Sequence, residues 1–287
     1  MKYVHFRHGN QWAVGQLTDD NTILEVHSSD PTLGVLALVE EGSVAAAPRR
    51  GQTHHVDDVE LGAPFPLPRR NIFCVGKNYR EHAAEFAGSG YDSGAAQVIP
   101  KFPIIFTKAP SSVTGPDTRV TVSENLSHEL DYEAELAVII GTGGRHITKE
   151  KALEHVWGYT LVNDLTARDL QRDHQQWFLG KSPDNFAPMG PWAVTKDEIN
   201  LDDTVITCTV NGELRQKANT ADLIFDIPTL IHTISAVMTL QPGDIIATGT
   251  PAGVGIGYTP PQFLADGDLV EVTATGLGTL RTHIHFE

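Results

Sequence analysis

Cysteine and long apolar runs are both scarce in this chain of 287 residues. Cys74 and Cys208 are its two cysteines, and their wide separation without CxxC spacing argues against a disulfide-bonded secreted scaffold. The longest apolar runs cover about five residues, such as Leu136 to Ile140, whereas a membrane-spanning helix needs roughly twenty. The amino terminus carries charged and polar residues where an export signal needs an apolar stretch. We therefore expect a cytoplasmic protein with two buried thiols and no membrane partner.

Positive charge is also in short supply. The 21 lysines and arginines are outnumbered by 36 aspartates and glutamates, which gives a formal net charge of −15. The basic residues form no stripe that could follow a phosphate backbone, so a nucleic acid partner is not expected. An acidic surface also repels an anionic substrate at long range, and such a substrate would need a metal ion or a lysine to reverse the field locally.

The first 65 residues are expected to form a small β-rich N-terminal domain. Gly and Asp/Asn turns separate short strand-like segments, and a short helix is expected near Leu33 to Glu40. The predicted strands are Tyr3 to Arg7, Trp12 to Leu17 and Thr22 to Val26. The proline-rich stretch from Gly62 to Arg70 predicts an extended linker, since each proline fixes its own backbone and restricts the residue before it.

Residues 70–287 are expected to form the larger domain. Predicted strands dominate this part and do not alternate with helices, so we expect an α+β fold that is mostly β, with a mixed rather than a doubly wound parallel sheet. Asn211-Gly212 between apolar runs predicts a two-residue hairpin turn. The predicted strands are Ile72 to Val75, Pro103 to Thr107, Leu130 to Ile140, Trp157 to Val162, Thr204 to Val210, Asp244 to Thr248, Asp268 to Ala274 and Thr279 to Phe286. The predicted helices are Tyr79 to Phe86, Lys149 to His155 and Ile227 to Thr239.

The segment DYEAELAVII carries an unusual row of acids. In a strand, Asp131, Glu133 and Glu135 share one face, roughly 6.6 Å apart, where charges repel by about 2 to 3 kcal/mol at an effective dielectric near 20. At a solvent-facing strand edge, water would screen this repulsion between the carboxylates. The apolar run that follows instead predicts burial, and buried carboxylates require a cation or protonation. Oxygen ligands alone favour a hard ion such as Mg²⁺, Mn²⁺ or Ca²⁺.

Asp164 is the predicted third carboxylate of this metal site, because it follows an apolar strand at the point where the chain opens into a loop. The adjoining residues predict a helical turn on which Asp164, Arg168 and Gln171 share a face. An Asp cap followed by a surface arginine is nearly as good an interpretation of this segment.

Two further segments add reactive groups. A short helix would bring His82 and Glu85 together at i,i+3, so that the carboxylate orients the imidazole as a general base. Lys181, in a predicted loop, could bind a carboxylate or stabilise a developing enolate. Taken singly, these groups would be ordinary surface residues. The glycine-rich stretch from Thr248 to Gly255 lacks the Lys-Ser/Thr pair of a phosphate loop, so nucleotide binding is not expected, although the stretch could shape a pocket.

The chain also resembles a known family, the fumarylacetoacetate hydrolase superfamily, over roughly residues 70–287. The resemblance rests on the motifs GKNYREHAAEF, DYEAELAVIIG, NDLTARDLQ, GKSPDNFAPMGPW and LQPGDIIATGTPAGVG, taken together. It implies a mixed β-roll core, a homodimer, and Mg²⁺, Mn²⁺ or Ca²⁺ held by Glu133, Glu135 and Asp164.

The same resemblance assigns roles to residues around the metal. It implies that His82 and Glu85 form a water-activating dyad on a segment that closes over the substrate. Lys181 is expected to stabilise developing negative charge. Contacts with the substrate are expected from four residues, namely Arg168, Gln171, Thr250 and Tyr79. Recognition of the distal group is expected from loops such as Ala87 to Lys101.

The function that follows is hydrolysis of a carbon–carbon bond in a small anionic 2,4-dioxo acid, such as an acylpyruvate or a sugar-derived diketo acid, with release of pyruvate. The same enolate chemistry would support decarboxylation of oxaloacetate or isomerisation and hydration of dienoic diacids. A non-catalytic metal-containing binding protein would leave His82, Glu85 and Lys181 without a task. A nicotinamide-dependent oxidoreductase would need a glycine fingerprint that the chain lacks.

Overall fold

The computed structural model describes residues 1–42, 48–91 and 98–287. Part of the loop predicted to recognise the distal group, residues 92–97, lies outside the described residues. Within the described part of the chain, no helix has the length and apolar character that crossing a membrane requires.

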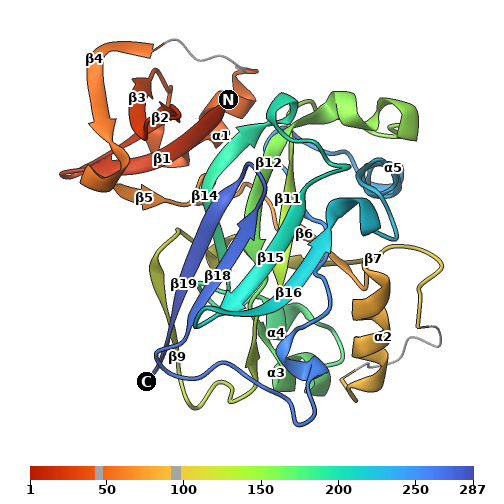
Figure 1. Ribbon diagram of the computed structural model, residues 1–287. Coiled ribbons are helices and arrows are strands. Elements are labelled where there is room, and N and C mark those ends of the chain that lie inside the picture. Colours follow the sequence, from red (N-terminus) through yellow and green to blue (C-terminus); the bar gives the residue numbers. More distant parts are fainter. Residues whose placement is uncertain (43–47, 92–97) are drawn as a thin grey trace.

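A twelve-stranded mixed sheet forms the centre of the molecule (Figure 1). Its path runs β4-β3-β2-β1-β14-β12-β11-β17-β6-β7, while β5 pairs with β1 and β8 pairs with β14. The pairs β17/β6 and β14/β8 are parallel, and the other neighbours are antiparallel. The strands are β1 (Lys2–His8), β2 (Gln11–Leu17), β3 (Thr22–Val26), β4 (Pro48–His55), β5 (Glu60–Gly62), β6 (Ile72–Gly76), β7 (Ile104–Lys108), β8 (Val113–Thr114), β11 (Ala134–Ile140), β12 (Val156–Asn163), β14 (Ala187–Thr195) and β17 (Ile245–Ala247).

A five-stranded sheet packs over β11 and β12, in the order β16-β15-β18-β19-β9. Its strands are β9 (Thr118–Val122), β15 (Val205–Val210), β16 (Glu213–Asn219), β18 (Leu269–Ala274) and β19 (Gly278–Phe286). Buried and half-buried residues alternate along β15 and β18, as expected where one sheet face meets the core. Asn211 and Gly212 join β15 to β16 with φ angles of 52° and 80°, which confirms the predicted hairpin turn.

Strand β11 is buried on both faces and divides two apolar cores. Leu136 and Val138 pack under the five-stranded sheet. Ala137 and Ile139 pack on the other side, in the core that includes Leu36 of α1. Because both faces are covered, the sequence of the strand from Leu136 onward is a continuous apolar run. The acids at its start are therefore buried as well. The mostly β, mixed-sheet fold class predicted from the sequence is confirmed.

Short helices surround the sheets, and α2, α3 and α4 lie at the end of the molecule away from the N-terminal strands (Figure 1). The helices are α1 (Leu36–Glu40), α2 (Arg80–Gly88), α3 (Arg168–Asp173), α4 (Phe178–Lys181) and α5 (Ile227–Val237). The segment Lys149–His155 is a 3-10 helix that runs straight into β12, where an ordinary helix was expected.

The predicted strand from Leu130 to Ile140 is interrupted. Its first two residues form β10 (Leu130–Asp131), which pairs with β13 (Thr166–Ala167), and β11 begins only at Ala134. Between them, the carboxylate of Asp131 accepts the amide of Tyr132 at 2.9 Å, and the amide of Glu133 donates to Asn163 at 3.2 Å. Side-chain hydrogen bonds thus interrupt the strand ladder, which resumes where the amide of Asp164 donates to the carbonyl of Glu133 at 2.8 Å.

The N-terminal strands are continuous with the larger part of the chain. Lys2 and Tyr3 of β1 pair with Val194 and Ala193 of β14. Phe65, in the predicted linker, is fully buried. Hydrogen bonding therefore crosses the boundary between residues 1–65 and 70–287, and a division into two domains stays a prediction.

Candidate active site

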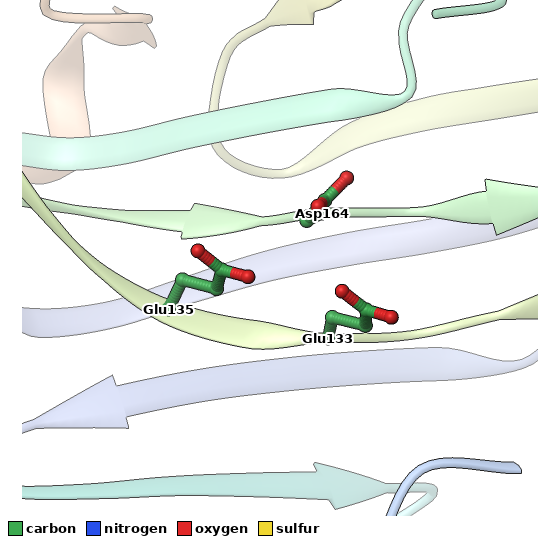
Figure 2. Close-up of side chains that lie close together, drawn as sticks. All are labelled: Glu133, Glu135 and Asp164. Atoms are coloured by element: carbon green, nitrogen blue, oxygen red, sulfur yellow. The ribbon is translucent and has the colours of Figure 1, made fainter. Parts of the chain in front are cut away.

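Three buried carboxylates form the centre of the site. Glu133 lies just before β11, Glu135 lies within it, and Asp164 follows β12, which is the antiparallel neighbour of β11. Figure 2 shows the two glutamates rising from one strand toward Asp164 on the next. One oxygen from each carboxylate lies within 4.8 Å of the others, and the three side chains are almost completely buried. The structure thus brings together the three predicted metal ligands.

These residues fit a hard divalent cation. The donors are carboxylate oxygens only, which suits Mg²⁺, Mn²⁺ or Ca²⁺. Burial raises the pKa of Glu135 well above its ordinary value, and the charges of Asp164 and Glu133 add to that rise. The carboxylate of Glu135 therefore needs either a proton or a cation beside it.

Three buried cations from separate elements contact the acids. The ammonium of Lys181, at the end of α4, donates to Glu133 at 2.7 Å and to Asp164 at 2.8 Å. Lys108, at the end of β7, donates to Asp164 at 2.6 Å and to the carbonyl of Leu165 at 3.0 Å. The guanidinium of Arg168 pairs with Glu133 at 2.7 Å. The loop predicted for Lys181 is therefore a helix end, and the side chain is buried.

The pKa values of the two lysines shift in opposite directions. Burial lowers the pKa of Lys108, and its pairing with Asp164 opposes this only in part. Burial also disfavours the charged form of Lys181, but the carboxylates of Asp164 and Glu133 outweigh it and raise its pKa. The same contacts hold the pKa of Glu133 below its usual value, because Lys181 and Arg168 outweigh the effect of burial. Lys181 and Glu133 are thus held in their charged forms.

Asp131 positions Arg168 rather than joining the row of acids predicted from strand spacing. Its carboxylate accepts the Nε–H of Arg168 at 2.9 Å and the amide of Gly255 at 2.6 Å. Arg168 also donates to Gln171 at 3.0 Å, across one turn of α3. Asp164 lies before β13 and not on this helix, so the predicted helical face shared by Asp164, Arg168 and Gln171 is wrong for Asp164.

The predicted pair on α2 is formed. Nδ1 of His82 lies 3.2 Å from a carboxylate oxygen of Glu85, and the other oxygen of Glu85 accepts the amide of Gly253 at 3.0 Å. Glu85 is thus fixed from two sides and orients the imidazole. Because Nδ1 faces Glu85, the opposite ring nitrogen of His82 is the one left to move a proton.

The glycine-rich stretch after β17 donates backbone amides to three acids of the site. Gly249 donates its amide to Glu135 at 2.8 Å, Gly253 to Glu85, and Gly255 to Asp131. Gly249 and Gly253 have φ angles of 105° and 100°, which favour glycine over residues with a side chain. The stretch shapes the site, as the sequence suggested.

A narrow pocket of about 280 Å³, including its open mouth, connects these groups. It brings together both glutamates of the triad and the predicted residues His82, Lys181, Arg168, Gln171 and Thr250. Tyr79 lies just before α2, pairs with Leu223, and has a pKa raised by burial. Its contact with substrate stays a prediction.

Sequence reasoning missed two lysines and an aromatic wall. Lys108 ends an apolar strand, and Lys77 follows Gly76 in a motif chosen for its histidine. Trp177 contributes to the wall with Phe86 and Phe106. A lysine directly after the four apolar or β-branched residues from Ile104 to Thr107 was the signal available for Lys108, since such a position predicts burial.

Residues 71–285 match the family described as Fumarylacetoacetate (FAA) hydrolase C-terminal. A protein of Bacillus subtilis (strain 168) named oxaloacetate tautomerase YisK is 42% identical and aligns over 99% of this chain and 100% of its own length.

Two solved structures extend the likeness to the fold. A fumarylacetoacetate hydrolase from psychrophilic Exiguobacterium antarcticum has a TM-score of 0.87 at 41% identity, with full coverage of both chains. A 5-carboxymethyl-2-hydroxymuconate delta-isomerase from Mycobacterium smegmatis has a TM-score of 0.79 at 32% identity, again over 100% of each chain. The resemblance seen in the sequence motifs is confirmed, and the chain belongs to the fumarylacetoacetate hydrolase superfamily.

Proposed function

We propose that this protein is a divalent-metal-dependent tautomerase of a small 2-oxo dicarboxylic acid such as oxaloacetate. The reaction moves one proton between C3 and the oxygen on C2, so that the enol and keto forms interconvert without any bond to water. The observation that carries the proposal is the end-to-end match to the Bacillus subtilis relative named as an oxaloacetate tautomerase. Similarity to an isomerase of an unsaturated diacid supports the same class of chemistry.

The charge balance of the site supports an anionic substrate. Four buried carboxylates, Asp131, Glu133, Glu135 and Asp164, meet three buried cations, Lys108, Arg168 and Lys181. Ionised, this set has a net charge of −1, and the ammonium of Lys77, which lines the same pocket, brings the total to 0. A bound Mg²⁺ or Mn²⁺ would change it to +2 and would supply Lewis acidity toward the oxygen of an enolate.

Different residues of the chain would transfer the proton, stabilise the developing charge and position the substrate. His82, oriented by Glu85, would take the proton from C3 through its free ring nitrogen or return it there. The ammonium of Lys181, kept charged by its two carboxylate partners, would face the oxygen where negative charge develops. Arg168, which donates to both Asp131 and Gln171, would fix the substrate against rotation together with Gln171.

Hydrolysis of a 2,4-dioxo acid, the first function predicted from the sequence, remains the second candidate. Similarity to the Exiguobacterium antarcticum hydrolase supports it. Hydrolysis would use the same dyad to activate water rather than to handle a carbon-bound proton. Decarboxylation of oxaloacetate, the other alternative, would need only the stabilised enolate.

One assay separates these reactions. Enol oxaloacetate is mixed with Mn²⁺-loaded protein, and keto product is trapped by malate dehydrogenase while pyruvate is detected by lactate dehydrogenase. A tautomerase accelerates the malate dehydrogenase signal and releases no pyruvate above background. Pyruvate from oxaloacetate would identify a decarboxylase, and pyruvate from an acylpyruvate would identify the hydrolase.

The metal and the dyad are tested in the same assay. Chelation is expected to abolish the acceleration, and His82→Gln is expected to reduce it about 10²- to 10⁴-fold. Wild-type rates in either case would refute the assigned roles. The homodimer and the cytoplasmic location stay predictions, and light scattering tests the first.

A further inference from the structure

Lys77 has a backbone conformation that a lysine rarely adopts. It lies between β6 and α2 with a φ of 55°, in the left-handed region. For a residue with a side chain this conformation costs roughly 1–2 kcal/mol, and it persists only where the surroundings impose it. Such positions concentrate at functional sites.

Both neighbours of Lys77 are fixed by tertiary contacts. The side-chain amide of Asn78 donates to the carbonyls of Thr248 and Phe225 at 2.7 and 3.1 Å, and its oxygen accepts the amide of Phe225 at 2.8 Å. On the other side, a Cβ added to Gly76 would lie 2.6 Å from the ring of Trp177. The backbone at Lys77 is therefore held in place from both directions.

The side chain of Lys77 turns into the active-site pocket. Its exposure is only 3%, and it lines the same pocket as Glu133 and His82. The ammonium lies 5.2 Å from the centre of the Phe86 ring, a favourable cation–π contact. Burial of a lysine together with a strained backbone points to a role at this site.

Contacts among three aromatic rings link Lys77 to Lys181. Phe86 contacts Trp177 at 5.8 Å between ring centres, and Trp177 contacts Phe106 at 5.1 Å. The ammonium of Lys181 lies 5.0 Å from the centre of Phe106. The pocket wall thus carries two lysines on one run of aromatic contacts, and hydrogen bonds to Glu133 and Asp164 hold Lys181 against the carboxylate triad.

We propose that Lys77 binds the second carboxylate of the substrate, the one remote from the metal, and so selects 2-oxo dicarboxylates over 2-oxo monocarboxylates. The inference deepens the proposed function and rests on it for the reaction. Lys181 receives the 2-oxo acid group, and the aromatic rings exclude water beside the two lysines. Lys77 is in this view a specificity residue.

The test uses pairs of stable ligands that differ only in the second carboxylate. Malate is compared with 2-hydroxybutanoate, and 2-hydroxyglutarate with 2-hydroxypentanoate, by calorimetry on Mn²⁺-loaded protein. In at least one pair, the wild type is expected to bind the dicarboxylate at least about tenfold more tightly than the matching monocarboxylate. One charge-assisted contact would give a difference of this size. Lys77→Met is expected to remove that preference and to leave monocarboxylate affinity within about twofold.

Matched variants isolate the charge. Lys77→Arg should keep the preference, and Lys151→Met, at an exposed lysine, should change nothing. Lys77→Asn provides a neutral residue that tolerates the left-handed backbone if the methionine variant folds poorly. Equal losses for both members of a pair, or no loss for either, would overturn the proposal.

Binding is measured without turnover, so the reaction and the specificity are tested separately. If the preference for dicarboxylates depends on Lys77 but enol oxaloacetate is not converted, the proposed tautomerase reaction is wrong and the proposed role of Lys77 stands. If oxaloacetate is converted and Lys77→Met leaves KM unchanged, Lys77 has been misassigned. The expected result is a higher KM for oxaloacetate with kcat little changed.

Discussion

At the scale of single residues, Glu135 is the acid most dependent on a cation. Its pKa is raised by burial and by the neighbouring Asp164 and Glu133. A carboxyl group whose pKa is higher in the folded chain than in the unfolded chain stabilises the fold below the unfolded pKa. That contribution is lost as the pH rises through the folded pKa. Metal-free protein should therefore lose stability as the pH rises above the ordinary value of 4.5.

Replacing Glu135 by glutamine is expected to remove this loss. In the presence of chelator at pH 7, Glu135→Gln should raise the free energy of unfolding by about 1–3 kcal/mol, because a buried glutamine needs neither a proton nor a cation. The increase in stability on adding Mn²⁺ should shrink sharply. Urea unfolding at pH 5, 7 and 9, with and without Mn²⁺, measures both effects.

The exposed Glu124 provides the control, since Glu124→Gln should leave both quantities unchanged. A Glu135→Gln protein that keeps the full stabilisation by Mn²⁺ would show that Glu135 is not a ligand.

The acids could be predicted from sequence, whereas most of their partners could not. Glu133 and Glu135 precede an apolar run, and that order alone predicts buried carboxylates. Lys108 reaches Asp164 from a strand 56 positions earlier in the chain. Such a contact depends on how β7 is placed beside β6, which no local pattern specifies.

At the scale of elements, α2 is held against the core by a polar contact of Glu85 within the helix and by contacts of Tyr91 just beyond its C-terminal end. Glu85 accepts the amide of Gly253. Beyond the end of α2, the hydroxyl of Tyr91 donates to Glu129 at 2.8 Å, while the guanidinium of Arg172 lies 5.3 Å from the Tyr91 ring centre. Phe86 adds an apolar contact with Val254 and Ile256.

Tyr91→Phe is expected to loosen α2 without changing the rest of the fold. Loss of one hydrogen bond weakens docking by about 1 kcal/mol, so amide hydrogen exchange in α2 should accelerate about fivefold. Exchange in β11 and β12 should stay as slow as in the wild type, which makes these strands the internal control. Unchanged exchange in α2 would mean that Tyr91 does not hold it.

Elements with a strong local signal were predicted well, and elements defined by distant partners were not. Thr22–Val26 was predicted with its observed ends, and the Asn211-Gly212 turn carries its own backbone preference. Strand β14 was missed because Pro188, Gly190 and Pro191 disrupt its local pattern, yet it lies between β1 and β12 in the sheet. Tertiary pairing outweighs local propensity in that strand.

At the scale of the whole molecule, the seam between β1 and β14 joins the N-terminal strands to the catalytic part. Tyr3 packs against Trp157 of β12, with ring centres 5.9 Å apart. Apolar side chains of α1 share a core with those of β11 and β14. A sheet and a core that cross the boundary should make the two parts cooperate in folding.

We therefore expect a single unfolding transition. Calorimetry on the full chain should give one peak whose van 't Hoff and calorimetric enthalpies agree, and fluorescence and circular dichroism should report the same midpoint. Two resolved peaks, the smaller one insensitive to Mn²⁺, would instead indicate an N-terminal domain that unfolds independently.

The glycine-rich stretch has a consequence for how this site can change. Three of its backbone amides act on three different acids: one in the metal triad, one beside the histidine, and one that anchors the arginine. A one-residue insertion there would displace all three together, so metal retention, proton transfer and substrate orientation should fail as a unit. New specificities are easier to reach at Lys77 or Phe106, which line the same pocket but do not belong to the apolar cluster that contains Val254 and Ile256.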